Sequence, residues 1–466
     1  MRMSVTRSNA PRRTRKCNFA LQLSALICIV AGAGGCGSST KPVTLVPPPN
    51  VVTGLPTPAA AGPVNTYNGG QSPGAWTLNL DDTKNAFSYQ PVTYPAQPVT
   101  GSLQVGGGFS SLGAAGLVYE VLGRAAVLRP GSSATSPIFA VPQTGCYAIT
   151  GKMRFQYIDL YPGSLATFLS ETNLDPLGYG SIVASTDPTG KTWQFENLQG
   201  SAGPVPNVQA SVVSGPASFT GSCAASNSEA SIGLSGPSLL DAYWATTDGT
   251  AFNGPSFVSS LSPTAQSIVW VGPSGFFAAD QSDPVQVPSS GASVAGMAEP
   301  ASPLSTSAVA AGQYLGFLYQ APISASSGSA ATTAFTAPVG FGQVVPSSGS
   351  TITGGIFPND DVTGTPNSDT QITLGTQDST VNGLYASVSI TVLDPAQNCA
   401  NFPGSPIGFP LSGVSSSVNA LGYVTCTFPG VAIAGNPDGK YAIFVSAYNW
   451  AAALGGVPEE FFLFQQ

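Results

Sequence analysis

The sequence predicts an all-β fold that is mainly antiparallel, with a β-sandwich or barrel-like body, two β subdomains and few short helices. Apolar and polar residues alternate in segments such as 76–80, 152–157 and 387–392, which is the period of a strand with one buried and one wet face. The chain also has 55 glycines and 41 prolines, which supply turns between such strands. Only 238–245 and 449–454 are compatible with short helices.

Turn sequences separate the predicted strands. Three of them combine proline, which presets φ, with glycine, which accepts a positive φ, and each predicts a hairpin: 187–190, 272–275 and 436–439. A Gly-x-Tyr pattern precedes apolar runs and predicts strand starts at Gly145, Gly312, Gly383 and Gly439. The irregular spacing of this pattern argues against a propeller or a solenoid of repeats.

The length of the chain predicts more than one domain, because single hydrophobic cores stop growing near roughly 250–300 residues. A stretch rich in Ser, Ala and Pro at 287–311 is the best internal boundary. The sequence therefore predicts a signal peptide at 1–35, a Pro-rich tether at 36–66 and two β domains at 67–290 and 305–466.

The N-terminal segment has the three parts of an export signal. The apolar run 19–30 is too short for a spanning helix, which needs about 20 apolar residues. Small residues follow it at 31–35, and basic residues without any acid precede it: Arg2, Arg7, Arg12, Arg13, Arg15 and Lys16. This order predicts a secretory signal peptide.

The end of that segment, Ala33-Gly34-Gly35-Cys36, resembles the lipobox of bacterial lipoproteins. The resemblance covers about the first 40 residues and implies acylation of Cys36, cleavage just before it and a lipid bilayer as partner. Gly37 at the next position implies sorting to the outer membrane. Ala33 stands where Leu is usual, so ordinary cleavage and release as a soluble protein is the alternative.

Charge limits the partners of the mature chain. The precursor has 14 basic and 22 acidic residues, and the signal removes six basic residues and no acid, which leaves 8 against 22, a net charge of −14. Nucleic acid and anionic headgroups are poor partners for such a surface. The chain has no histidine, which excludes Ser-His-Asp, Cys-His and His-metal chemistry.

Four cysteines of the mature chain follow Cys36. An even number in an oxidising compartment predicts two disulfides, and we favour the sequential pairs Cys146–Cys223 and Cys399–Cys426. Loop closure gives about 4.5 and 3.6 kcal/mol as upper values for their stabilisation.

Acidic residues suggest one metal site. Four of them lie close together among Gly, Thr, Ser and Asn, namely Asp360, Asp361, Asp369 and Asp378. Oxygen-rich loops of this kind can hold Ca²⁺, although the spacing of an EF-hand loop is absent, so a plain polar loop is the alternative. No other cofactor is expected.

Aromatic residues suggest a sugar-binding surface. Trp193 and Trp270 lie within predicted strands, where packing in the core explains them. Tyr243, Trp244 and Trp450 lie in less regular surroundings and are the candidates for ligand binding.

The function best supported by the sequence is that of an exported envelope lipoprotein with a non-catalytic structural or binding role. Its partner would be a polysaccharide or another envelope protein. The alternative is a carbohydrate-active enzyme, since glycosidases need only two carboxylates. Asp159 and Glu196, both at strand positions, are the first candidates for that pair.

A substitution tests the lipid anchor. We expect Cys36→Ser to abolish partitioning of the protein into the detergent phase, because the acyl chains would be lost and stable anchoring takes more than one chain. Retention in the detergent phase would instead indicate an uncleaved signal that anchors the chain.

Overall fold

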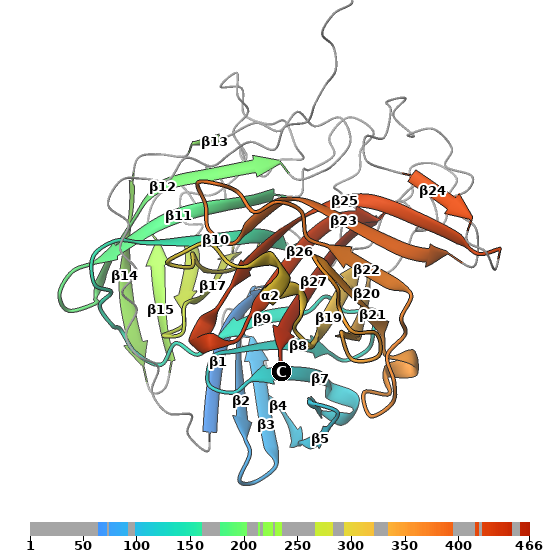
Figure 1. Ribbon diagram of the computed structural model, residues 1–466. Helices are drawn as coiled ribbons and strands as arrows, with labels where there is room; N and C mark the ends of the chain where they lie inside the picture. Colours follow the sequence, from blue (N-terminus) through green and yellow to red (C-terminus); the bar gives the residue numbers. More distant parts are fainter. Residues whose placement is uncertain are drawn as a thin grey trace, which may run out of the picture. The chain divides into compact units, whose positions relative to one another are not determined.

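The computed structural model describes residues 64–71, 74–91, 98–160, 178–202, 213–214, 218–226, 229–234, 266–282, 293–320, 334–394, 415–418, 422–449 and 457–466. These residues form three nine-stranded antiparallel sheets and a few short helical turns, which confirms the all-β prediction (Figure 1). The helical turns are α2 (Thr306–Ala310), η1 (Gly113–Ala115), η4 (Pro358–Asp360) and η6 (Pro437–Gly439).

The first sheet has the strand order β4-β3-β2-β1-β9-β8-β7-β6-β5. Only Leu103 separates the two strands at its ends, β4 and β5, so a single bent segment joins both edges and closes the sheet into a ring. The strands are β1 (Val64–Gln71), β2 (Gly74–Asp81), β3 (Ala86–Pro91), β4 (Val99–Ser102), β5 (Gln104–Gly106), β6 (Phe109–Ser111), β7 (Gly116–Val121), β8 (Ala125–Pro130) and β9 (Ile138–Val141).

The second sheet has the order β11-β10-β18-β17-β16-β15-β14-β12-β13, and a further pairing of β11 with β12 closes it. We call this ring the second barrel. Its strands are β10 (Met153–Leu160), β11 (Gly178–Thr186), β12 (Thr192–Ala202), β13 (Val213–Ser214), β14 (Ser218–Ser226), β15 (Glu229–Leu234), β16 (Gln266–Val271), β17 (Phe276–Ser282) and β18 (Ser293–Ala298).

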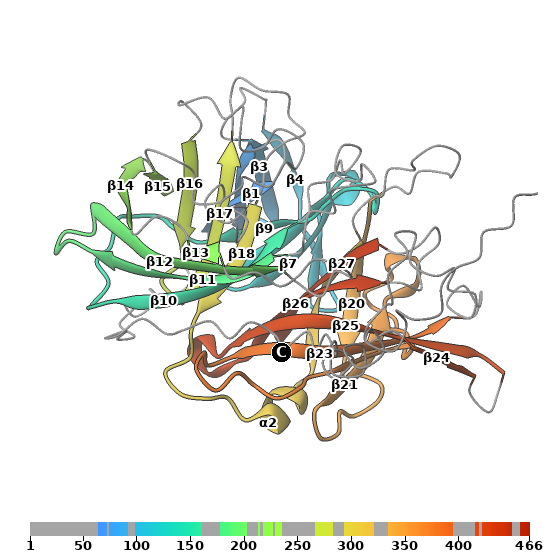
Figure 2. The ribbon, with the colours of Figure 1, turned by 90° about the horizontal axis from the view of Figure 1, so that it is seen from above.

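The third sheet has the order β23-β22-β21-β20-β19-β27-β26-β25-β24, and pairing of β23 with β25 closes it into the third barrel. Figures 1 and 2 show β23 beside β25, with β24 at the edge. Its strands are β19 (Tyr314–Gln320), β20 (Phe335–Phe341), β21 (Thr351–Ile356), β22 (Thr370–Thr373), β23 (Leu384–Asp394), β24 (Ser415–Val418), β25 (Val424–Gly435), β26 (Ala442–Asn449) and β27 (Val457–Gln465).

Each ring is filled by apolar side chains from alternate positions of its strands. A further apolar cluster, which we call the central core, takes side chains from the opposite faces of all three sheets. In this core the ring centroid of Phe139 lies 6.0 Å from that of Phe276, 5.1 Å from that of Phe444 and 6.3 Å from that of Phe462. The three sheets therefore meet through their outer faces.

Strands that reach the central core are buried on both faces. In β27, Phe461 and Leu463 face the interior of the third barrel, whereas Phe462 and Phe464 belong to the central core. The same division holds in β9 and β17. Double burial explains why these segments are continuous apolar runs and not alternating ones.

The structure confirms the three predicted hairpin turns, because 187–191, 272–275 and 436–441 each connect paired neighbouring strands. The strand start predicted at Gly145 is wrong, since 142–152 forms no strand. The predicted helix 238–245 lies outside the described residues. Of the predicted helix 449–454, Asn449 ends strand β26 and the rest lies outside them.

The division into domains at 290 and 305 stays a prediction. The predicted first domain contains most of the first sheet and most of the second barrel, whereas residues 64–66 of β1 lie in the predicted tether and β18 lies beyond residue 290. In the part of the chain that the structure describes, no helix has the length and apolar character needed to cross a bilayer.

A double-mutant cycle tests the central core. We expect Phe462→Ala to lower the free energy of unfolding by about 3–5 kcal/mol. Combined with Phe139→Ala it should show a coupling of about 0.5–1.5 kcal/mol, because the two rings stack across sheets. Phe461→Ala, one position away and facing the barrel interior, is the control. The coupling free energies are measured by chemical denaturation. If Phe461→Ala and Phe462→Ala were coupled equally to Phe139→Ala, the assignment of Phe461 to the barrel interior and of Phe462 to the central core would be wrong.

Candidate functional site

Several residues predicted to carry function lie outside the described part of the chain. These are the lipidation site Cys36, the disulfide candidate Cys399 and the ligand-binding candidates Tyr243, Trp244 and Trp450. Trp193 and Trp270 are buried in the second barrel and the central core, which confirms their prediction as core residues.

The cysteines form at least one of the two predicted disulfides. Cys146 is bonded to Cys223, with their Cα atoms 5.8 Å apart, which confirms that pairing. Cys426 is also disulfide-bonded. Its pairing with Cys399 stays a prediction.

Two of the predicted calcium ligands cap turns. Oδ1 of Asp361 accepts hydrogen bonds from Thr363 N (3.2 Å) and Oγ1 (2.7 Å), and Oδ1 of Asp378 accepts from Thr380 N and Oγ1 at 2.7 Å each. The same Asp-x-Thr arrangement occurs in the turns that begin at residues 81 and 187. The hydrogen bond from Thr363 is the main cause that lowers the pKa of Asp361.

The other two predicted calcium ligands have separate partners. Oδ2 of Asp360 lies 2.8 Å from Nη1 of the buried Arg129 on the first sheet, and Asp369 accepts a hydrogen bond from Thr370 Oγ1 at 3.2 Å. Over the described ranges, no three His, Cys, Asp or Glu side chains come together as a metal site. The four carboxylates therefore form no shared calcium site of three or more such ligands.

The backbones of the two candidate glycosidase residues lie far apart in the second barrel. Glu196 is in register with Val183 of β11, which is in register with Arg154 of β10. Asp159 lies five residues farther along β10, or about 16 Å at 3.3 Å per residue. Catalytic pairs are held at about 5–10 Å, so these backbones are not placed for a shared reaction. Glu196 instead forms an ion pair with Lys152.

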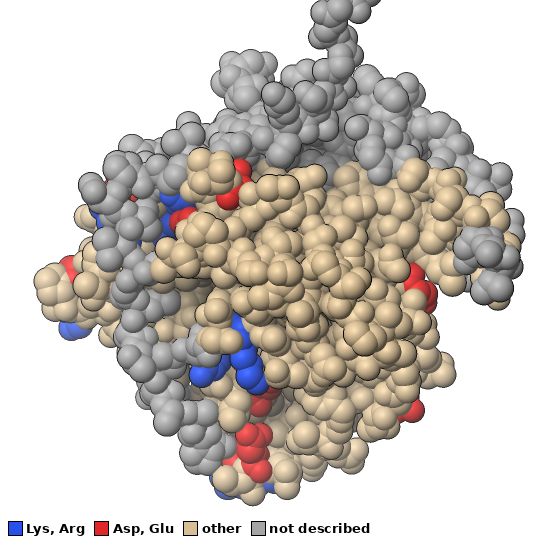
Figure 3. Space-filling model, viewed as in Figure 1, with Lys and Arg blue, Asp and Glu red and all other residues tan. Residues whose placement is uncertain are grey.

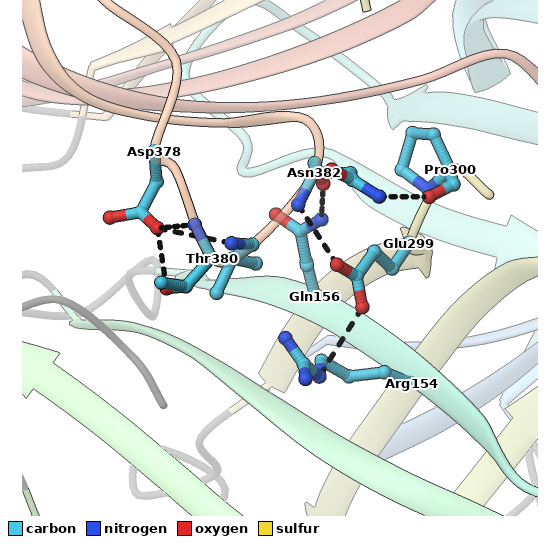
Figure 4. Close-up of polar contacts among 8 residues, drawn as sticks. Arg154, Gln156, Glu299, Pro300, Asp378, Thr380 and Asn382 are labelled. Atoms are coloured by element: carbon cyan, nitrogen blue, oxygen red, sulfur yellow. Dashed lines mark hydrogen bonds and ion pairs between the residues drawn. The ribbon is translucent and has the colours of Figure 1, made fainter. Parts of the chain in front are cut away.

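A buried polar centre joins the second and third barrels (Figure 4). Nε of Arg154 on β10 lies 3.3 Å from Oε2 of Glu299, which directly follows β18. Oε1 of Glu299 accepts from the backbone N–H of Asn382 at 2.9 Å, in the connection before β23. Asn382 Nδ2 donates to the carbonyl of Pro300 at 2.9 Å, and its own carbonyl accepts from the amide of Gln156.

This centre corrects the assignment of a wet face to β10. The side chain of Arg154 is only 1% exposed and Gln156 is buried as well, because the outer face of β10 packs against the third barrel and not against water. Burial raises the pKa of Glu299, and the charge of Arg154 opposes that change. Alternation alone located the two faces of the strand but could not show which of them another sheet covers.

The loop after Asn382 needs a glycine to make this contact. Gly383 has φ +81°, and a Cβ there would lie 2.1 Å from the carbonyl oxygen of Ala434. It would also lie 3.1 Å from Cδ of Pro300. Gly383 therefore lets the chain pass between the backbone of β25 in the third barrel and the Pro300 ring in the segment after β18.

A second buried acid lies at one end of the third barrel. Glu459 lies two residues before Phe461 in β27, on the face of the strand that points into the barrel. Its Oε2 accepts hydrogen bonds from Gln320 Nε2 (2.8 Å) and Asn449 Nδ2 (2.6 Å). Burial raises the pKa of Glu459 to about 7, and the two amide hydrogen bonds act in the opposite direction. The neighbouring Glu460 is buried in β27 as well.

The two ends of the second barrel differ in the length of their connections. The strand registers bring Leu160, Ala202, Leu234 and Ser282, each the last residue of its strand, to one end of the barrel, which we call the loop end; in the sequence 10 to 31 residues separate each of them from the next strand of the antiparallel wall. At the other end, the turn end, the described turns 187–191 and 272–275 join neighbouring strands. Tyr243 and Trp244 belong to the longest connection of the loop end.

The described surface carries few charges. Figure 3 shows a face on which Lys, Arg, Asp and Glu occupy only a few separate places. Charged residues make up 8% of the whole chain. Contacts on such a face would depend on hydroxyl, amide and backbone groups.

The pKa of Glu459 gives a testable pH dependence. Its folded-state pKa of about 7 lies above the ordinary value of 4.5, so its contribution to stability is full below pH 4.5 and is lost as pH rises to 7. We expect Glu459→Gln to be more stable than wild type by up to about 3 kcal/mol at pH 8 and not at pH 4.5. Chemical denaturation at both pH values measures this. Glu196→Gln, which removes a partly exposed carboxylate, is the control, and parallel pH profiles for wild type and Glu459→Gln would contradict the prediction.

No protein-family model and no curated protein sequence matches the chain. Among solved structures it is similar to a double mutant of the vaccine antigen transferrin binding protein B from Haemophilus parasuis, at 9% identity and a TM-score of 0.24, covering 89% of this chain and 78% of that one. It is also similar to intact Ap-TbpB with its N and C lobes, at 9% identity and a TM-score of 0.24, covering 86% and 67%. At these values the likeness establishes neither a shared fold nor a function.

Proposed function

We propose that this protein is an exported, lipid-anchored envelope protein that binds its partner without catalysis. Its anchor is the acylated Cys36, and its binding surface is the loop end of the second barrel. The partner is a polysaccharide or another envelope protein. The outer membrane is the expected location.

The observation that carries the proposal is the asymmetry of the second barrel. In the sequence, long connections follow the four strands that end at the loop end, whereas the strands of the barrel are joined at the turn end by short turns. Rigid β scaffolds commonly carry binding residues on the longer loops at one end. The longest connection contains Tyr243 and Trp244, whose rings suit the apolar faces of sugars or a protein surface.

Export is supported by the N-terminal signal pattern and by the cysteines. The disulfide Cys146–Cys223 is of the kind that persists in an oxidising compartment. The Pro-rich tether would hold the barrels away from the bilayer.

A non-catalytic role is supported by the use of the buried polar side chains. Arg154, Glu299 and Asn382 join two barrels, and Arg129 joins the first sheet to Asp360 of the third. These groups are engaged in holding the sheets together. The separation of Asp159 from Glu196 argues against the glycosidase alternative.

Thermal unfolding of the full chain in detergent, against a panel of envelope polysaccharides and oligosaccharides, tests the proposal. A ligand at 100 times its Kd adds about 2.7 kcal/mol to the stability of the native state. We expect one glycan class to raise the Tm, and the double substitution Tyr243→Ala/Trp244→Ala to remove that rise. Tyr423→Ala, an exposed tyrosine on the third barrel, is the matched control and should leave the rise unchanged.

The other outcomes separate the alternatives. Two results together would select the envelope-protein partner. No glycan would raise the Tm, and a protein that crosslinks to the wild-type chain in intact cells would no longer crosslink to Tyr243→Ala/Trp244→Ala. Release of shorter oligosaccharides from a glycan would overturn the non-catalytic role. Crosslinks and Tm values that the double substitution leaves unchanged would exclude the loop end as the binding surface.

A further inference from the structure

The segment that links the first sheet to the second barrel, residues 142–152, forms a strap across the turn end of that barrel. It forms no strand and lies between β9 and β10. Its first anchor is Gln143, which is fully buried. Oε1 of Gln143 accepts from Val271 N at 2.9 Å, and its carbonyl accepts from Ala230 N at 2.9 Å and from Asn68 Nδ2 at 3.0 Å.

The middle of the strap lies against the turn that connects β11 and β12. Gly190 of that turn has φ +69°, and a Cβ on it would lie 2.2 Å from the carbonyl carbon of Tyr147. The ring of Tyr147 packs edge-on against Trp193 with centroids 6.3 Å apart. Two residues later in the strap, the N–H of Ile149 donates to Thr186 Oγ1 at 3.0 Å. Ile149 and Tyr147 thus extend the apolar interior of the barrel.

Apart from the peptide bond into β10, the covalent link between the strap and the barrel wall among the described residues is the disulfide between Cys146 and Cys223 of β14. The described strap forms no strand, so its noncovalent closure depends on single hydrogen bonds and on the packing of Tyr147 and Ile149 against the barrel interior. The hydroxyl of Tyr147 is buried without a hydrogen-bond partner in the described structure, which disfavours the closed position. The disulfide therefore holds in place a residue that is costly to bury.

We propose that oxidation of Cys146 and Cys223 is the step that closes the strap, so that the turn end of the second barrel is sealed only in an oxidising compartment. In the reduced chain the strap is open and the interior around Trp193 is accessible from the turn end. The inference rests on the proposed export of the protein, because a reduced chain would keep this barrel unsealed until it leaves the cytoplasm.

The chemistry is thiol–disulfide exchange with a disulfide-bearing oxidase or a small disulfide. One cysteine thiolate attacks a sulfur of the oxidant disulfide, which breaks that S–S bond and gives a mixed disulfide and one oxidant thiol. The second cysteine thiolate then attacks the mixed disulfide, which forms the Cys146–Cys223 bond and releases the second oxidant thiol. The two cysteines lose two electrons and two protons, and the oxidant gains both.

Hydrogen–deuterium exchange of the full chain tests the proposal. In Cys146→Ser/Cys223→Ser we expect the amides of Ile149, Ala230 and Val271 to exchange at least tenfold faster than in wild type. Each of these amides donates a hydrogen bond that joins the strap to the barrel. Ladder amides of β16 and β17 that do not face the strap should be unchanged. Cys399→Ser/Cys426→Ser, which removes cysteines of the third barrel region, is the matched control and should leave the three strap amides unchanged.

A second measurement does not depend on the variant folding. The oxidised wild-type chain is reduced with dithiothreitol, and its exchange is followed before and after addition of oxidised glutathione. We expect the protection of Ile149, Ala230 and Val271 to be lost on reduction and restored on oxidation. Protection that persists in the reduced chain would overturn the proposal, since noncovalent contacts would then close the strap.

These readouts are independent of the proposed function. They use purified protein, whereas export and anchoring are tested in cells by the detergent partitioning of Cys36→Ser. If the strap opens on reduction but the protein is not exported, redox closure of the strap is established, and the proposal that closure depends on the cellular compartment is overturned.

Discussion

The structure depends on the burial of strands on both faces where the three sheets meet. Phe139, Phe276 and Phe462 come from three different sheets, and each lies on a strand whose alternate side chains fill a ring interior. Since neither face of these strands is wet, stability comes from stacking barrels on one another as much as from filling them. The connection lengths and the polar contacts follow from this arrangement, because what faces another sheet must be apolar or paired.

Polar side chains at the sheet junctions obey that rule. Arg154 and Glu299 are paired between the second and third barrels, and Arg129 is paired with Asp360 between the first sheet and the third barrel. A buried charge without its partner would cost several kcal/mol, so such pairs favour one relative placement of the sheets over others.

The sequence was sufficient for the fold class and many of its turns, because period-two alternation and Pro-Gly turns are local signals. It also identified the Cys146–Cys223 disulfide. It failed where the outcome depends on a distant partner. The polar face of β10 was assigned to water, although Arg154 meets Glu299 and Gln156 meets Asn382. At a different, local level, the acids near residue 360 suggested calcium, whereas the Asp-x-Thr spacing, which is visible in the sequence, indicates turn capping. The closure of the rings depends on pairings between remote strands, which local alternation does not reveal.

Strand β27 has a consequence for the timing of folding. It pairs with β19 and β26, and its Phe462 and Phe464 complete the central core, so neither the third barrel nor the junction of the sheets can be completed before residues 457–465 are available. A chain that crosses a membrane from its N-terminus delivers this strand after all the others. Partly assembled sheets with open edges would meanwhile be exposed, which favours association with a holding chaperone during passage. Under the proposed export, completion of the third barrel and of the central core would thus follow transport.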